Sequence, residues 1–272
     1  MTINCNQKLI DLSTPKVMGV LNITPDSFFD GGKYKNEKEI LTQVEKMLSE
    51  GADFIDVGAY SSRPGAKHIS EKEELSRIVP VIKLITKEFS NALISVDTFR
   101  SEVANQTINE GATIINDISG GKMDKDMFSI VAKLQVPYIM MHMKGTPQNM
   151  QQNPEYENVV TEVISYFAEQ LFKLKELKVN DVIIDVGFGF GKTIEHNYEL
   201  LKKLSLFKNL DVPVLTGVSR KSMLYKTLGI SPQDALNATT VANTIALLNG
   251  TNILRVHDVK EAVEAVKIVS KL

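Results

Sequence analysis

Eight short apolar runs, each separated from the next by a helical pattern, constrain the fold of this chain more than any other feature. They lie at 17–21, 54–57, 93–96, 113–115, 138–141, 182–186, 214–218 and 252–256. The runs are continuous rather than alternating, which is typical of parallel strands that are covered on both faces. Between Asn22 and His257 the intervals average about 34 residues, a length that suits strand–helix–strand units.

The segments between the runs have the apolar spacing of amphipathic helices. Val160, Val163, Ile164 and Phe167, for example, follow the i, i+3, i+4, i+7 pattern. Pro80 lies inside the second of these segments, and we expect it to kink or restart that helix.

Alternating strands and helices of this number predict an α/β protein with a single (β/α)8 (TIM) barrel, and we take residues 1–272 as one domain. A doubly wound open sheet fits the same pattern, because the number of strands does not show whether a sheet closes. Residues 1–16 precede the first strand, and we expect them to form a short hairpin on the floor of the barrel.

Composition narrows the classes of protein and partner. The chain has 31 basic and 33 acidic residues and is 43% hydrophobic, a balance that argues against disorder and gives no electrostatic footprint for nucleic acid or a membrane surface. Cys5 is the only cysteine, which excludes an intramolecular disulfide and a cysteine-rich metal site. Without an apolar run long enough to span a bilayer or a signal-peptide core, we expect a cytoplasmic protein.

Polar residues end or follow every apolar run, at the end of a barrel where catalytic groups gather from several strands. They are Asn22, Asp56, Asp97, Asn116, Asp117, His142, Asp185, Ser219, Arg220, Lys221, Arg255 and His257. Asp56, Asp97 and Asp185 belong to runs that should be buried, where a carboxylate is costly unless a partner or ligand satisfies it. We interpret Asp117 as a turn residue and His142 as a packed side chain.

Two loops follow the first two strands and carry a second signal. Residues 22–32 and 58–66 are rich in Gly, Pro, Ser and Asp, and they contain Phe28, Asp30 and Arg63. Aromatic and charged side chains in such segments favour mobile lids over passive turns.

The segment DVGFGFGKT, at 185–193, resembles nucleotide-binding loops but fails both patterns. A phosphate loop needs glycine where Val186 stands, and a dinucleotide fingerprint needs glycine where Lys192 stands. We therefore expect no nucleotide site here.

Eight motifs, in order along nearly the whole chain, resemble the dihydropteroate synthase family of bacterial folate synthesis. They are NITPDSFFDGG (22–32), DVGAYSSRPGA (56–66), SVDTFR (95–100), INDISGG (115–121), MMHMKGTPQNMQ (140–151), IDVGFGFGKT (184–193), GVSRKSM (217–223) and RVHDV (255–259). The chain departs from the family pattern at Phe29, Ala59, Tyr60 and Val186. These positions lie beside the residues that contact ligands in the family, so we expect them to affect the affinity for p-aminobenzoate and sulfonamides rather than the reaction.

The resemblance implies a transferase that joins 6-hydroxymethyl-7,8-dihydropterin pyrophosphate to p-aminobenzoate, with release of pyrophosphate and 7,8-dihydropteroate. It also implies a homodimer, Mg²⁺ as cofactor and small-molecule substrates as partners. As pyrophosphate leaves, the pterin methylene becomes cationic, and a nearby carboxylate would stabilise it.

The same resemblance assigns roles to individual residues. The pterin contacts are Asp97, Asn116, Met140, Asp185, Lys221 and Arg255. The pyrophosphate contacts are Asn22, Ser62, Arg63, Arg255 and His257, and Asn22 is also the Mg²⁺ ligand. The p-aminobenzoate contacts are Phe28, Arg63, Pro64, Phe190, Lys221 and Ser222. The catalytic residues are Asp56, Asp30, Lys221 and Arg63, of which the two carboxylates are the candidates for stabilising the cation.

Two alternatives stay open from the sequence. A methyltetrahydrofolate-binding domain of a corrinoid methyltransferase shares the pattern of Asp97, Asn116 and Asp185, but gives no reason for Arg63 and the paired loops. A non-catalytic pterin binder would retain the pocket and lack turnover.

Overall fold

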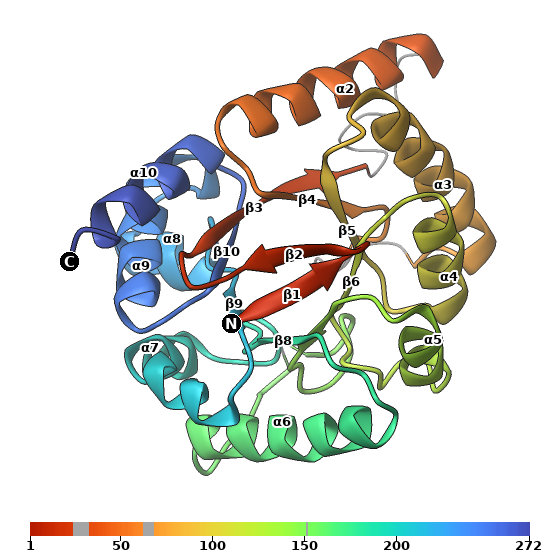
Figure 1. Ribbon diagram of the computed structural model, residues 1–272. Helices are drawn as coiled ribbons and strands as arrows, with labels where there is room; N and C mark the ends of the chain where they lie inside the picture. Colours follow the sequence, from red (N-terminus) through yellow and green to blue (C-terminus); the bar gives the residue numbers. More distant parts are fainter. Residues whose placement is uncertain (24–32, 62–67, 151) are drawn as a thin grey trace.

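Eight parallel strands form a closed barrel in the computed structural model, which describes residues 1–23, 33–61, 68–150 and 152–272 (Figure 1). The strands are β3 (Lys16–Asn22), β4 (Phe54–Gly58), β5 (Leu93–Asp97), β6 (Ile114–Asp117), β7 (Tyr138–Met141), β8 (Val182–Asp185), β9 (Val214–Thr216) and β10 (Ile253–Val256). Neighbours in sequence pair in parallel, and β10 pairs with β3 to close the ring. The barrel prediction is confirmed, and the open sheet is excluded.

Helices surround the barrel, as Figure 1 shows. They are α2 (Lys33–Ser49), α3 (Glu71–Glu88), α4 (Ser101–Asn109), α5 (Met127–Leu134), α6 (Val159–Glu176), α7 (Ile194–Lys202), α8 (Ser222–Leu228), α9 (Leu236–Leu248) and α10 (Val259–Val269), with short 3-10 helices η1 (Leu204–Leu210) and η2 (Pro232–Asp234). None of the helices in the described ranges is long and apolar enough to cross a membrane.

Helix α3 runs through Pro80 without a break, so the expectation of a restart there is wrong. The helix begins at a Ser70 cap, whose hydroxyl accepts a hydrogen bond from the Glu73 amide. Ile78, Ile82 and Ile85 are fully buried against the barrel on both sides of the proline. Burial of these side chains on one face outweighs the backbone hydrogen bond that proline cannot make.

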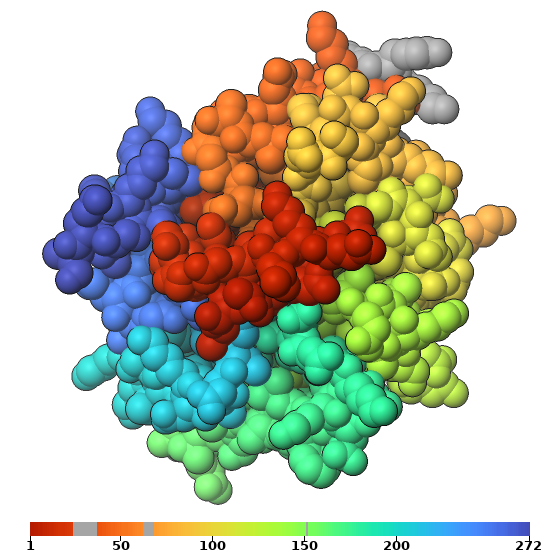
Figure 2. All heavy atoms as spheres, viewed as in Figure 1, coloured from red at the N-terminus to blue at the C-terminus, as the bar shows by residue number. Residues whose placement is uncertain are grey.

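A two-stranded hairpin closes the amino-terminal end of the barrel, as predicted. β1 (Thr2–Cys5) pairs antiparallel with β2 (Lys8–Asp11), and the two strands cross the centre of the ring in Figure 1. In the same view Figure 2 shows this segment, in red, lying over the middle of that face. The hairpin residues Ile3 and Cys5, with Leu12, pack against inward-facing residues of the strands, namely Met18, Phe54, Ile114, Ile139, Ile183, Leu215 and Ile253.

The opposite, carboxyl end of the barrel is polar because strand register places polar residues side by side. Asp56 is the partner of Ser95, and Asp97 is the partner of both Gly58 and Asn116. Met141 is likewise the partner of Asp185. Consecutive strands therefore deliver carboxylates and an amide to one end, while the floor stays apolar.

The hairpin makes a testable contribution to stability. Leu12 is fully buried and Leu9, in the same hairpin, is 71% exposed. Leu12→Ala removes core volume and should lower the free energy of unfolding by about 2–5 kcal/mol, measured by urea denaturation. Leu9→Ala is the matched control and should change it by about 0.5 kcal/mol or less. Equal effects of the two substitutions would show that the hairpin is not part of the core.

Candidate active site

Arg255 joins two carboxylates at the carboxyl end of the barrel. Its Nε lies 2.6 Å from Asp56 Oδ2 and its Nη2 lies 2.8 Å from Asp97 Oδ2. Asn116 donates a hydrogen bond from Nδ2 to the same Asp56 oxygen, at 3.0 Å. Four strands, β4, β5, β6 and β10, thus contribute to one network. Among the described residues, Asp97, Asn116 and Arg255, which are predicted to contact the pterin or the pyrophosphate, therefore share one mouth of the barrel with Asp56.

The electrostatics of this network follow from burial and pairing. Burial raises the pKa of Asp97 to about 7, although Arg255 opposes the shift. The pKa of Arg255 lies above its ordinary value, because Asp56 and Asp97 outweigh the opposing effect of burial. Asp56 is fully buried, and its second oxygen, Oδ1, has no hydrogen-bond partner in the described part of the chain.

Asp185 and Lys221 form the second part of the site. Asp185 ends β8, and its Oδ1 accepts a hydrogen bond from the Gly187 amide at 2.8 Å. Lys221 donates to the Phe188 carbonyl, and its ammonium lies 4.3 Å from the centroid of the Phe190 ring. Burial raises the pKa of Asp185, and Lys221 opposes that shift. Burial lowers the pKa of Lys221 to about 8, with Asp185 opposing.

The two halves of the site meet at Gly217. A Cβ at this position would lie 3.9 Å from Asp185 Oδ2 and 3.8 Å from Arg255 Cβ. The carboxylate of Asp185 and the side chain of Arg255 therefore flank the same glycine just beyond the end of β9.

His257, a predicted pyrophosphate contact, lies just after β10 beside Ser219. Its Nδ1 is 3.0 Å from the Ser219 hydroxyl, and its amide donates to the same oxygen at 3.2 Å. Burial lowers the pKa of His257 to about 4, so the imidazole is neutral at pH 7. Arg220 is held away in a bidentate pair with Asp258, at 2.7 and 2.9 Å. Arg255 therefore supplies the positive charge on this side of the described site.

The remaining predicted residues of the described chain lie at strand and helix ends. Asn22 ends β3, and its Oδ1 would lie 3.7 Å from a Cβ at Gly58. Met140 is fully buried on β7, and Ser222 begins α8. Their roles toward ligands stay predictions.

Several predicted residues lie outside the described residues. They are Phe28 and Asp30 of the first loop, with Phe29 beside them, and Ser62, Arg63 and Pro64 of the second. The roles given to these residues, and the expected mobility of the two loops, stay predictions.

Two residues expected to be structural are confirmed as such. Asp117 accepts hydrogen bonds from the Ser119 amide and hydroxyl and from the Gly121 amide, and Tyr138 donates its hydroxyl proton to the same carboxylate. His142 is buried, and its ring packs edge-on against Tyr166 with 4.9 Å between centroids.

Metal ligands are sparse among the described residues. No group of three or more His, Cys, Asp or Glu side chains in the described ranges could hold an ion. Asn22 supplies a single amide oxygen, a ligand type that Mg²⁺ accepts. Because Mg²⁺ keeps waters and takes further ligands from substrate phosphate, this donor set fits an ion that arrives with pyrophosphate.

Sequence reasoning misses the contacts made by two residues in the loops that follow the strands. Lys192 stands out in the sequence only as the residue that breaks a nucleotide motif, yet it is 3% exposed and its ammonium lies 3.0 Å from His142 Nδ1. Tyr60 stands out only as a departure from a family pattern. Its hydroxyl lies 3.2 Å from His68 Nδ1 and accepts a hydrogen bond from Gln148, so it ties two loops together. For Lys192, the only indication in the sequence is a lysine at the end of a glycine-rich run.

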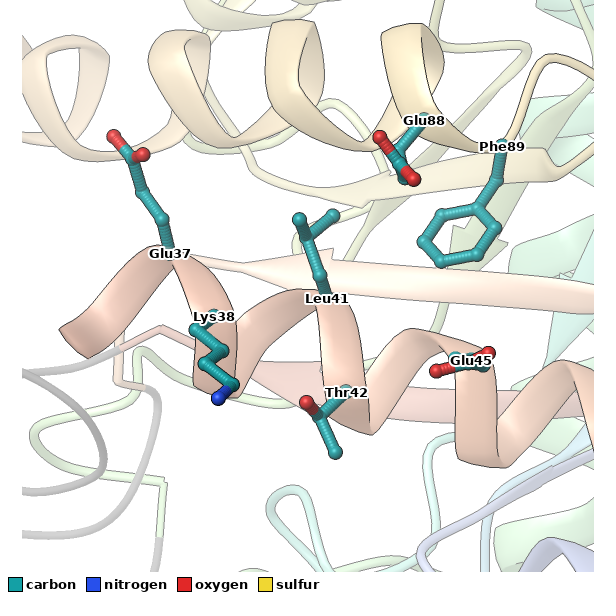
Figure 3. Close-up of a pocket in the computed structure, with 7 residues that line it drawn as sticks. All are labelled: Glu37, Lys38, Leu41, Thr42, Glu45, Glu88 and Phe89. Carbon is teal, nitrogen blue, oxygen red and sulfur yellow. The ribbon is translucent and has the colours of Figure 1, made fainter. Parts of the chain in front are cut away.

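A separate groove of about 340 Å³ lies on the outer wall of the barrel, between α2 and the end of α3 (Figure 3). Its lining residues are Glu37, Lys38, Leu41, Thr42, Glu45, Glu88 and Phe89. None of them belongs to the network at the carboxyl ends of the strands, so this groove is not part of the candidate site.

The fold and the site define a barrel enzyme of the pterin-binding class, since carboxylates and an amide suited to a flat heterocycle lie beside an arginine suited to an anion. Residues 18–257 match the family model described as pterin binding enzyme. The chain is 42% identical to dihydropteroate synthase of Escherichia coli strain K12, over 96% of this chain and 92% of that protein. It is 41% identical to the Haemophilus influenzae enzyme of the same name, over 98% of each.

Solved structures agree with this likeness. The Yersinia pestis dihydropteroate synthase with a sulfonamide drug complex superposes with a TM-score of 0.93 at 41% identity, covering 100% of this chain and 98% of that one. The Thermus thermophilus enzyme in complex with 4-aminobenzoate gives 0.90 at 34% identity, covering 100% of both chains. The chain belongs to the dihydropteroate synthase family, which confirms the family predicted from the motifs.

The carboxylate of Asp185, a predicted pterin contact, can be tested directly. Asp185→Asn should weaken pterin binding by about 1.5–3 kcal/mol, because it removes a charged hydrogen-bond acceptor, and calorimetry measures the change. Asp181→Asn is the control: Asp181 precedes the same strand at the other end of the barrel, where it accepts a hydrogen bond from the Asn4 amide. Unchanged pterin affinity in Asp185→Asn would remove this residue from the pocket.

Proposed function

We propose that this chain condenses 6-hydroxymethyl-7,8-dihydropterin pyrophosphate with p-aminobenzoate, giving 7,8-dihydropteroate and pyrophosphate in folate biosynthesis. The observation that carries the proposal is the direct contact of Arg255 with Asp56 and Asp97. It brings carboxylates suited to the pterin and its cationic methylene together with a guanidinium suited to the pyrophosphate. The family supports the same reaction, since the relatives compared above are named dihydropteroate synthase.

The pterin is proposed to bind through its hydrogen-bonding edges. Its 2-amino group and N3 proton would donate together to the carboxylate of Asp185, as a bidentate pair. Asp97 and Asn116 would contact other ring nitrogens, and Lys221 the ring carbonyl and N5. Met140 and the guanidinium of Arg255 would cover the two ring faces.

The proposed reaction breaks the bond between the pterin methylene carbon and the pyrophosphate oxygen. Arg255 and His257, with Ser62 and Arg63, would hold the departing anion. Asp56 or Asp30 would stabilise the cationic methylene, an interaction that gains strength only as charge develops. Asp56 supports this role by having one buried oxygen without a partner among the described residues.

The amine of p-aminobenzoate would then bond to the methylene carbon and lose a proton. Phe28, Pro64 and Phe190 are proposed to surround its ring. Its carboxylate would lie near Ser222, at the amino end of α8. No protein nucleophile is needed, because the amine itself attacks the methylene carbon, and Lys221 is proposed to act as a hydrogen-bond donor rather than as a covalent catalyst.

Mg²⁺ is proposed as the cofactor, bound together with pyrophosphate and with Asn22 as its protein ligand. We also propose that residues 1–272 act as one domain, in the cytoplasm and without nucleic acid or membrane partners. These proposals rest on the family and on the near-neutral charge of the chain.

The test is turnover by the purified protein. Protein, Mg²⁺ and both substrates should yield dihydropteroate and pyrophosphate in equal amounts, and omission of either substrate should abolish dihydropteroate. Folded protein that forms neither product contradicts the proposal. Binding of methyltetrahydrofolate without a response to pyrophosphate would favour the methyltransferase domain, and substrate binding without turnover would favour a non-catalytic binder.

The pH dependence of turnover should be bell-shaped. Asp97 has a pKa of about 7, so below that pH its carboxylate becomes protonated and no longer acts as a charged hydrogen-bond acceptor. Lys221 has a pKa of about 8 and loses its proton above it. We therefore expect kcat/KM to be greatest between about pH 7 and pH 8 and to fall on both sides, since this ratio reports groups of the free enzyme.

Lys221→Arg assigns the alkaline limb of that profile. Lys192 also titrates in this range, with a pKa of about 7, so the limb needs assignment. A guanidinium keeps its charge throughout, so the variant, although slower, should lose the part of the alkaline decline that Lys221 causes, and the decline that remains belongs to Lys192. Persistence of the same decline would show that Lys221 is not the group responsible.

A homodimer is proposed through the face formed by α8, α9 and α10, which lie together in Figure 1. Large apolar side chains are exposed there, namely Leu228, Ile230, Val241, Ile245, Leu248 and Ile268. Gathered apolar side chains of this kind mark protein interfaces.

Light scattering coupled to size exclusion tests the proposed dimer. The double variant Val241→Lys, Leu248→Lys should run as a monomer, because it buries two charges at an apolar contact. Phe172→Lys on α6 is the control, since Phe172 is 66% exposed on another face of the barrel, and this variant should stay dimeric. A wild-type monomer, or a dimer in the double variant, contradicts this interface.

A further inference from the structure

The glycine-rich segment after β8 folds around its own lysine. The ammonium of Lys192 lies 3.0 Å from the Gly187 carbonyl, 3.1 Å from the Phe190 carbonyl and 3.3 Å from the His142 carbonyl. The fourth neighbour is His142 Nδ1, at 3.0 Å. The three carbonyls accept hydrogen bonds in any case. His142 Nδ1 can accept as well, because burial lowers the pKa of His142 to about 2 and keeps its ring neutral.

Glycine is required for this arrangement. Gly187 has φ of +71° and Gly191 has φ of +61°, a region that other residues rarely adopt. A Cβ at Gly187 would collide with the His142 carbonyl oxygen, and one at Gly191 with the Lys144 carbonyl oxygen. The loop thus approaches the β7 end closely enough to turn its carbonyls onto Lys192.

The same loop contacts both charged residues of the pterin half of the site. The Gly187 amide donates to Asp185 Oδ1 at 2.8 Å. The Phe188 carbonyl accepts a hydrogen bond from Lys221, and the Phe190 ring lies against the Lys221 ammonium. The loop is also anchored to α7, because Asn197 Oδ1 accepts from the Gly189 amide at 2.7 Å.

We propose that Lys192 is a positioning residue for pterin recognition: its ammonium fixes the 187–191 loop, and the loop in turn orients Asp185 and Lys221. The inference rests on the proposed function, since it concerns the pterin half of that site. Lys192 supplies the charge that draws three carbonyls and an imidazole inward, and without it these buried acceptors would face one another unpaired. Arg255 and His257, the described residues proposed to hold the pyrophosphate, make no hydrogen bond or ion pair with Lys192 or with its four acceptors in the described part of the chain.

The test separates the two halves of the site with two probes. Lys192→Met keeps an unbranched side chain of similar length and removes the positive charge and the N–H donors. In this variant the Kd of 6-hydroxymethyl-7,8-dihydropterin, measured by calorimetry, should rise by about tenfold to a hundredfold, as expected for misplaced binding groups. The Kd of inorganic pyrophosphate with Mg²⁺ should stay unchanged. A purely structural role would weaken both ligands together.

Lys144→Met is the matched control. Lys144 is nearby but half-exposed, with its ammonium 3.5 Å from Glu162 and 4.2 Å from the centroid of the Tyr156 ring. This variant should bind both probes as the wild type does.

The outcomes decide the inference. Lys192→Met that folds and binds the dihydropterin as the wild type does, or that loses both ligands equally, overturns it. If Lys192→Met does not fold, Lys192→Gln takes its place, because it keeps a polar donor and removes the charge. A selective loss of dihydropterin affinity in Lys192→Gln then supports the inference, and unchanged affinity overturns it.

Failure of the inference can be told apart from failure of the proposed function by wild-type turnover. Product formation with unchanged Lys192→Met affinity removes only the positioning role. Absence of product, with dihydropterin affinity that depends on Lys192, removes only the proposed reaction.

Discussion

The pairing of Arg255 with Asp56 and Asp97 is the interaction on which the rest of the site depends. Asp56 is fully buried, and a buried carboxylate is tolerated only with a charge partner and hydrogen bonds. Arg255 and Asn116 supply these at the same oxygen. Loss of one member of a buried pair costs several kcal/mol, because the other charge is left uncompensated. The network therefore couples β10 to β4 and β5 energetically as well as spatially.

The barrel divides its two ends between stability and chemistry. At the amino-terminal end, the hairpin covers a layer of apolar side chains that includes Met18 and Phe54. This layer carries no charge, so it stabilises the ring without competing for the polar groups above it. At the other end, burial of charged groups costs free energy. It raises the pKa values of Asp97 and Asp185 and lowers that of Lys221. Such shifts are typical of sites that act on ligands.

The sequence predicts the barrel well and the site in part, for a physical reason. Strand positions follow from local apolar runs, and Asp56, Asp97 and Asp185 stand out because a carboxylate in such a run needs a partner. The partner itself could not be identified, since Arg255 lies 199 residues from Asp56 and only closure of the ring joins β10 to the first strands. The restart expected at Pro80 is wrong because packing of the helix on the barrel overrides a local rule. Lys192 was missed because its acceptors are backbone carbonyls, which leave no mark in a sequence.

The segment at 185–193 shows why a motif must be interpreted by the direction of its backbone groups. A phosphate-binding loop turns its N–H groups inward and cradles an anion. Here the carbonyls of Gly187 and Phe190 point inward, toward the Lys192 ammonium. Where a dinucleotide-binding loop has glycine, this chain has Lys192, and the loop presents carbonyl oxygens rather than N–H groups to its centre. The loop is already filled by a cation of the same chain, so it cannot serve as a phosphate cradle. Asp185 and Lys221 are in this way held by the loop after β8, whereas Arg255 on β10 is held by Asp56 and Asp97, so the two groups of charged residues are positioned by separate contacts.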